Sequence, residues 1–376
     1  MYIMLNVINI GAAKPDYKPF TPFSVLPSFI QTRLFITTRI PGYPLSFFEV
    51  DFVFTAAYSL ATTFKQPSSH LMIIRPSQHW FRRLFVWHGS VLSKIMFRLS
   101  LNVLMSVIAV LSYQWYESLG VHLTLAPFSL LGVAIAIFLG FRNNASYARF
   151  IEARTLWGSL LITQRSLLRQ IKSTLLSDDA AVREISALMM AFNWSLKHQL
   201  RQTDGRADLL RLLPPRWHDQ VMNDPSPCNQ LLLCMGIWLG EQRQRGVISD
   251  IVWQSIDANI NHLSQVLGGC ERIVTTPIPF AYSLILHRTV YLFCTLLPFA
   301  LVADLHYMTP LVSVFVSYTF LSLESLAEEL EDPFGMAAND LPLDALCVII
   351  ERNLKALQSD YPLPEPLKPD NHYNLT

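Results

Sequence analysis

Three bulky apolar residues recur at every fourth position within the apolar segment 121–141: Val133, Ile137 and Phe141. On a helix, residues with this spacing lie near one face. A ring of bulky apolar side chains can close a narrow aqueous path to ions, because water wets such a constriction reluctantly. The same stripe also suits contact with lipid or packing against another helix, so the spacing alone leaves these three roles open.

The sequence around this stripe predicts a membrane-spanning helix. An apolar run of about 20 residues is long enough to cross a bilayer, and here the run ends at Phe141 in a basic, amide-rich segment. Small residues alternate with the bulky ones and would let neighbouring helices approach closely: Gly132, Ala134, Ala136 and Gly140.

Residues that could perform catalysis are not grouped in any familiar pattern. The sequence has no HExxH, nucleophile elbow, P-loop or GxGxxG motif, and its histidines are dispersed. The five cysteines form no CxxC pair, and we expect them to be reduced thiols: Cys228, Cys234, Cys270, Cys294 and Cys347. We therefore expect no enzymatic activity, no cofactor and no bound metal.

Composition also favours a membrane protein. The 376 residues are 51% hydrophobic and only 15% charged, which is unusual for a soluble domain. The formal net charge of +1 argues against a general nucleic-acid binder.

The hydropathy pattern predicts an all-α membrane protein with four transmembrane helices and a helical cytoplasmic domain. The expected spans are 95–116, 121–141, 281–303 and 308–326, preceded by an aromatic, basic interfacial helix at 72–94. The segments 142–279 and 328–376 are expected to be cytoplasmic. Within them, apolar residues at helical spacing predict three further helices: Ala187–His198, Ile248–Leu267 and Leu343–Leu357. Lysine and arginine gather in 75–98 and 142–278 and are absent from the two short links that join the first span to the second and the third span to the fourth. This distribution predicts a protein of the cell's inner membrane whose two termini lie in the cytoplasm.

Three other segments raise separate questions. Residues 1–71 lack periodicity, and we expect them to be disordered or to be a non-native extension from an upstream start codon. His287 and Arg288 lie early in the third span, either as a functional pair or as side chains that reach the interface. The acidic stretch 324–332 would attract cations if it faced a conduit.

Three long strings, in order, carry a resemblance to the bestrophin family, including its bacterial branch. They are GFRNNASYARFIEARTLWG at 140–158, GGCERIVTTPIPFAY at 268–282 and EELEDPFGMAANDLP at 328–342. The resemblance extends from about Met72 to about residue 355, and it implies a homopentameric ion channel embedded in membrane lipid. Eukaryotic members pass chloride, whereas bacterial members are described as favouring monovalent cations.

The resemblance also assigns residues. It places the family's apolar neck on Val133, Ile137 and Phe141, and its cytosolic constriction in 249–256, which we place at Ile251. The calcium clasp of eukaryotic members corresponds to a segment in which only Asp332 and Asp340 keep ligand-capable oxygens at matching places. Calcium prefers six to eight oxygen ligands, so we expect an acidic vestibule or a vestigial clasp and no gating by calcium.

Two other functions are compatible with this reading of the sequence. A membrane-anchored scaffold would bind a partner through its cytosolic helices and conduct nothing. A secondary transporter would show inverted repeats and interrupted helices, neither of which the sequence displays.

Overall fold

The computed structural model describes residues 89–118, 124–176 and 178–369, together with Phe81, Gly120 and Leu375. All of them belong to one compact unit, Pro67–Thr376. In this part of the chain every regular element is helical, as the sequence predicts. The expected extension at 1–71 and most of the expected interfacial helix at 72–94 lie outside the described residues.

The helices follow one another in this order: α3 (Leu92–Ser118), α4 (Leu125–Thr174), α5 (Asp179–Arg201), α6 (Arg206–Leu212), η1 (Pro215–Trp217), α7 (His218–Met222), α8 (Pro227–Gln244), α9 (Asp250–Thr275), α10 (Phe280–Leu305), η2 (His306–Met308), α11 (Thr309–Glu331) and α12 (Leu343–Gln358). The start of α3 at Leu92 means that Leu92–Lys94 belong to the same helix as the first expected span.

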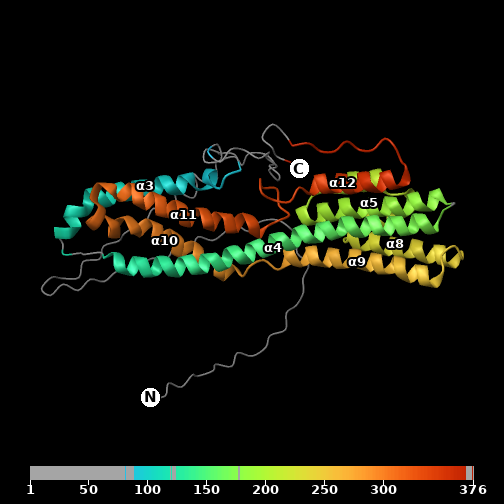
Figure 1. The fold of residues 1–376 in the computed structure, drawn as a ribbon, viewed down its shortest axis with the longest axis horizontal. Coiled ribbons are helices and arrows are strands. Elements are labelled where there is room, and N and C mark those ends of the chain that lie inside the picture. Colours follow the sequence, from blue (N-terminus) through green and yellow to red (C-terminus); the bar gives the residue numbers. More distant parts are fainter. Residues whose placement is uncertain are drawn as a thin grey trace, which may run out of the picture. The chain divides into compact units, whose positions relative to one another are not determined.

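Helix α4 takes part in two bundles. Its first half packs with α10 and α11, which in turn pack with α3, and its second half packs with α5, α9 and α12 (Figure 1). With 50 residues, α4 is about 75 Å long. The expected boundary between residues 141 and 142 therefore falls inside one continuous helix. The segment 142–174 contains no proline and a single glycine, so the return of charged residues changes the surroundings of the helix without ending it.

Each bundle has its own apolar core. The first is built from residues of α3, α4, α10 and α11: Ile95, Leu99, Ile135, Val290, Phe293, Cys294, Leu297, Leu301 and Leu321. The second is much larger, and its largest fully buried side chains include Trp157, Trp238 and Phe192. Because α4 contributes residues to both cores, this one continuous helix connects the two bundles.

Among the residues that the structure describes, three helical stretches are long and apolar enough to cross a membrane: Leu92–Ser118, Leu125–Thr174 and Phe280–Glu331. The third contains both α10 and α11, which are joined by the short turn η2. The protein is thus an all-α membrane protein, and the number of four spans stays a prediction.

Candidate functional site

The apolar stripe on α4 is exposed in the isolated chain. Val133, Ile137 and Phe141 are 61%, 52% and 61% exposed, whereas Ile135 and Leu139 on the opposite face are buried against the first bundle. The subunit therefore covers one side of α4 and leaves the stripe free. Bulky apolar groups in this arrangement can meet lipid, a neighbouring subunit or the axis of a ring of subunits.

The two glycines of this segment differ in what surrounds them. A Cβ atom added to Gly132 would lie 3.4 Å from the ring of Phe293, so this glycine allows α4 and α10 to approach closely. A Cβ atom at Gly140 would meet no described atom within 4 Å. Gly140 thus leaves open space beside Ile137 and Phe141 within the subunit.

A charged cluster lies directly beyond the stripe, and it draws one residue from each helix of the first bundle. Glu324 of α11 is 2% exposed. Its Oε1 lies 2.8 Å from His287 Nδ1 of α10 and 3.7 Å from Arg142 Nη1 of α4, and its Oε2 lies 3.3 Å from Arg98 Nη1 of α3. His287 is therefore paired with the buried carboxylate of Glu324. The sequence could not reveal this pairing, because the partners of Glu324 come from three different helices.

The acidic stretch 324–332 is largely neutralised by ion pairs. Glu329 pairs with Lys94 at 2.8 Å, and Glu331 pairs with Arg142 at 3.4 Å. With Glu324 buried as well, three of its acids face cationic side chains of the same subunit. Two acids of this stretch, Glu328 and Asp332, are exposed, so they are the ones that could attract cations if the stretch faces a conduit.

Ile251 lies at the start of α9, far along the chain from the stripe. The Ser249 side chain caps this helix by accepting from the backbone N–H of Val252 at 3.5 Å. Ile251 is 82% exposed, and its neighbour Asp250 pairs with Arg243 at 2.7 Å. An apolar residue this exposed at a helix start contributes nothing to the core of its own subunit.

The loop after α11 brings Asp332 and Asp340, the two carboxylates at the expected clasp positions, together around Gly335. A Cβ atom at Gly335 would lie 2.6 Å from Asp340 Oδ2 and 3.1 Å from Asp332 Oδ2, so a larger residue there would require the carboxylates to move. Asp340 Oδ2 accepts from the backbone N–H of Ala337 at 2.5 Å. Burial, with a further contribution from the charge of Asp332, raises the pKa of Asp340 to about 7.

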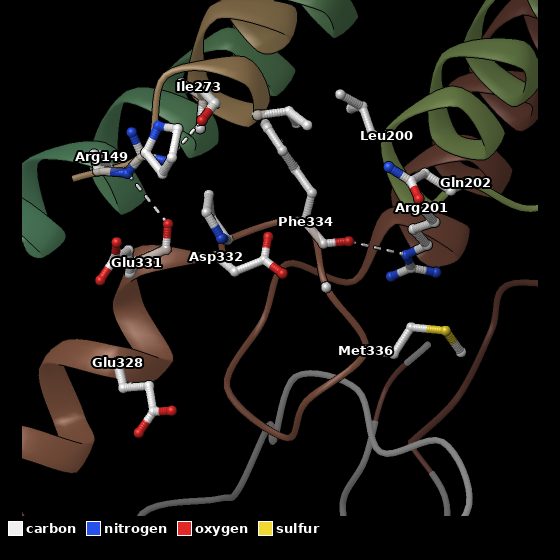
Figure 2. Close-up of a pocket in the computed structure, with 14 residues that line it drawn as sticks. Arg149, Leu200, Arg201, Gln202, Ile273, Glu328, Glu331, Asp332, Phe334 and Met336 are labelled. Carbon is white, nitrogen blue, oxygen red and sulfur yellow. Dashed lines mark hydrogen bonds between the residues drawn. The ribbon is translucent and has the colours of Figure 1, made fainter. Parts of the chain in front are cut away.

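A cavity of about 530 Å³ adjoins this loop (Figure 2). Figure 2 shows Arg149 and Arg201 on opposite sides of Asp332 and Phe334. Arg149 donates to the carbonyls of Ile273 and Thr276 at 2.6 Å and of Glu331 at 3.2 Å, which caps the ends of α9 and α11. These hydrogen bonds fix the walls of the cavity.

Reactive groups are scarce around these features. Within the described ranges, no group of three or more His, Cys, Asp or Glu side chains is placed to hold a metal ion. All five cysteines are free and buried. Burial raises the pKa of the Cys228 and Cys270 thiols to about 12, which keeps them protonated and unreactive at neutral pH.

Comparison with known proteins adds to this geometry. The family model described as "Bacterial/Fungal Bestrophin protein" matches residues 72–356. The voltage-dependent anion channel-forming protein YneE of Escherichia coli K12 is 58% identical over 305 residues, covering 81% of this chain and all of that protein. A protein of the same description from Ralstonia nicotianae, RSc3414, is 44% identical over 290 residues, covering 76% of this chain and 94% of that one.

Solved structures agree with the sequence matches. The crystal structure of a bacterial bestrophin homolog from Klebsiella pneumoniae is 63% identical in sequence and superimposes with a TM-score of 0.70, covering 71% of this chain and all of that chain. The match to the family model includes the strings at 140–158, 268–282 and 328–342, because all three lie within residues 72–356. The chain belongs to the bacterial and fungal bestrophin family.

Proposed function

We propose that the protein is the subunit of a homopentameric ion channel in the bacterial inner membrane, with its termini in the cytoplasm. The observation that carries the proposal is the exposed stripe of Val133, Ile137 and Phe141 on a helix whose other face is buried. Five copies of α4 around one axis would form three stacked apolar rings. Membership of the bestrophin family and the name of the E. coli relative support conduction of ions.

In this proposal the neck is formed by the three residues of α4, and Ile251 forms a second constriction on the cytosolic side. The apolar rings carry no charge, so they control whether water and ions pass and select little between ions. The names of the curated relatives favour anions such as chloride, and conduction of monovalent cations is the competing outcome.

Reconstitution of the purified full chain into liposomes tests the proposal. We expect ion flux above that of empty liposomes and a mass of five subunits in mild detergent or native-like lipid. The reversal potential in asymmetric potassium chloride then gives the sign of the conducted ion. Intact oligomers without flux would favour a scaffold, and flux without discrete single-channel steps would favour a transporter. A monomer or dimer in lipid would overturn the pentameric pore.

A further inference from the structure

The charged cluster beyond the neck joins a titratable residue to the helix that carries the stripe. His287 Nδ1 and Arg142 Nη1 both face Oε1 of Glu324, at 2.8 and 3.7 Å. The side chain of His287 is 45% exposed in the subunit, whereas those of Arg142 and Glu324 are 5% and 2% exposed. A proton that reaches His287 from solvent therefore changes the charge beside a buried ion pair.

Arg142 is held weakly for a buried arginine. Its Nη2 contacts Glu331 at 3.4 Å, and among the described residues its Nε and Nη1 have no hydrogen-bond partner. Its remaining attraction to Glu324 is electrostatic over 3.7 Å. Because a buried charge depends strongly on its partners, a change in the charge around Glu324 acts directly on Arg142.

The charges of the cluster balance while His287 is neutral. Arg98 and Arg142 then supply two positive charges, and Glu324 and Glu331 supply two negative charges. Protonation adds a hydrogen at His287 Nε2 and leaves one uncompensated positive charge, so His287 competes with Arg142 for Oε1 of Glu324. The titratable and charged groups around His287 are the ring of Tyr291 on its own helix at 4.3 Å, Glu324 of α11 at 2.8 Å, and Arg98 of α3 and Arg142 of α4, which share the Glu324 carboxylate. Glu328 of α11 adds a negative charge near Tyr291.

We propose that protonation of His287 loosens the contact between Arg142 and Glu324 and thereby releases the end of the neck, because Arg142 directly follows Phe141 in α4. This inference rests on the proposed channel function and assigns a regulatory input to it. His287, Glu324 and Arg142 act as positioning residues for Phe141. In this proposal flux is higher when His287 is protonated than when it is neutral.

The test measures flux of monovalent ions from liposomes that hold the full chain, between about pH 8 and about pH 5.5. The wild-type protein gives a several-fold rise on acidification. His287→Gln, which cannot be protonated, keeps the low flux of alkaline pH throughout. His287→Arg, which stays charged, gives the high flux of acidic pH even at the alkaline end. A merely structural role of His287 would not produce opposite, pH-independent levels in the two variants.

His262→Gln is the matched control. His262 lies on α9 and contacts Gln265 at 3.1 Å, away from the charged cluster, so this variant keeps the wild-type rise. The inference is overturned if wild-type flux is independent of pH, or if His287→Gln retains the rise. Should His287→Gln fail to assemble, His287→Arg alone decides, since a pH-dependent flux in that variant overturns the inference. Absence of flux from the wild-type chain at every pH would instead overturn the proposed function.

Discussion

The side-chain amide of Asn102 in α3 donates to the backbone carbonyl of Cys294 in α10 at 2.7 Å, deep in the first bundle. This carbonyl lacks its usual helical donor, because the residue four positions later is Pro298, which has no N–H. Ser313 of α11 donates to Asn102 Oδ1 at 3.1 Å, so one buried amide joins three helices. An unpaired carbonyl in an apolar membrane bundle is costly, and Asn102 removes that cost.

Asn102→Ala should lower the free energy of unfolding by about 1–3 kcal/mol, because it leaves the Cys294 carbonyl without a donor. Pro298→Ala restores a backbone N–H to that carbonyl. We therefore expect Asn102→Ala to cost less in the Pro298→Ala background than in the wild-type background. Thermal or denaturant unfolding in detergent measures all four proteins of this cycle. Equal costs in both backgrounds would show that the proline does not explain the hydrogen bond.

Shrinking the neck residues should increase conduction without unfolding the protein. Ile137 and Phe141 are exposed in the subunit, so Ile137→Ala and Phe141→Ala widen the proposed rings and leave no cavity in the core. We expect higher flux from liposomes and little change in the midpoint of thermal unfolding. Leu139→Ala is the control on the buried face of the same helix, and it should cost about 2–5 kcal/mol of stability. Lost stability with unchanged flux in the neck variants would place these residues in a packed interface instead.

The presence of long apolar helices could be read from the sequence, whereas the pairing between them could not. The expected segments 95–116 and 281–303 lie within α3 and α10, and 308–326 begins one residue before α11, because apolar length and proline punctuation are local signals. The continuity of α4 past Arg142 was missed, since a change from apolar to charged residues does not itself break a helix. The contacts of Glu324 join residues separated by up to 226 positions, and no local pattern encodes them.

Adjacent glycines in α9 should respond in opposite ways to the same substitution. A Cβ atom at Gly269 would lie 2.8 Å from Leu156 Cδ2 of α4, whereas a Cβ atom at Gly268 would meet no described atom within 4 Å. Alanine is favoured over glycine inside a helix by about 1 kcal/mol. Gly268→Ala should therefore raise the unfolding free energy by up to about 1 kcal/mol, and Gly269→Ala should lower it by about 1–3 kcal/mol through overpacking. Unfolding of the two variants side by side checks this, and a shared gain would mean that Leu156 moves aside freely.

Ionisation of Asp340 should make the protein less stable in alkaline solution. The pKa of Asp340 rises from 3.8 to about 7 on folding, so the folded state binds the proton more tightly than the unfolded state. Its contribution to stability is complete below about pH 4 and is lost as the pH rises through about 7. Asp340→Asn should remove this loss, which we expect to be on the order of a few kcal/mol.

The measurement for Asp340 is the midpoint of thermal unfolding at about pH 5 and about pH 8. The fall in the unfolding midpoint from the acidic to the alkaline condition should be smaller in Asp340→Asn than in the wild-type protein. Asp360→Asn, which changes an exposed carboxylate, should show no such gain. A parallel pH dependence in Asp340→Asn and the wild type would mean that Asp340 is ionised throughout.

Calcium should not alter conduction. Asp332 and Asp340 are the only clasp positions with carboxylates, and calcium usually takes six to eight oxygen ligands. The nearby Glu329 is already engaged by Lys94 and by the amide of Asn339. Flux in a chelator should equal flux in micromolar calcium. A large, reversible increase with calcium would show that these two aspartates suffice for a working site.

The unbroken α4 helix places a restriction on the length of the chain between its two bundles. Each residue turns an α-helix by about 100° and lengthens it by about 1.5 Å. One extra residue after Phe141 would therefore rotate the stripe, together with the first bundle, by about a quarter-turn relative to the second bundle. Seven extra residues would leave a rotation of only about 20°. This stretch of the sequence should therefore tolerate substitutions far better than single insertions or deletions, and length changes that do survive should come in whole heptads.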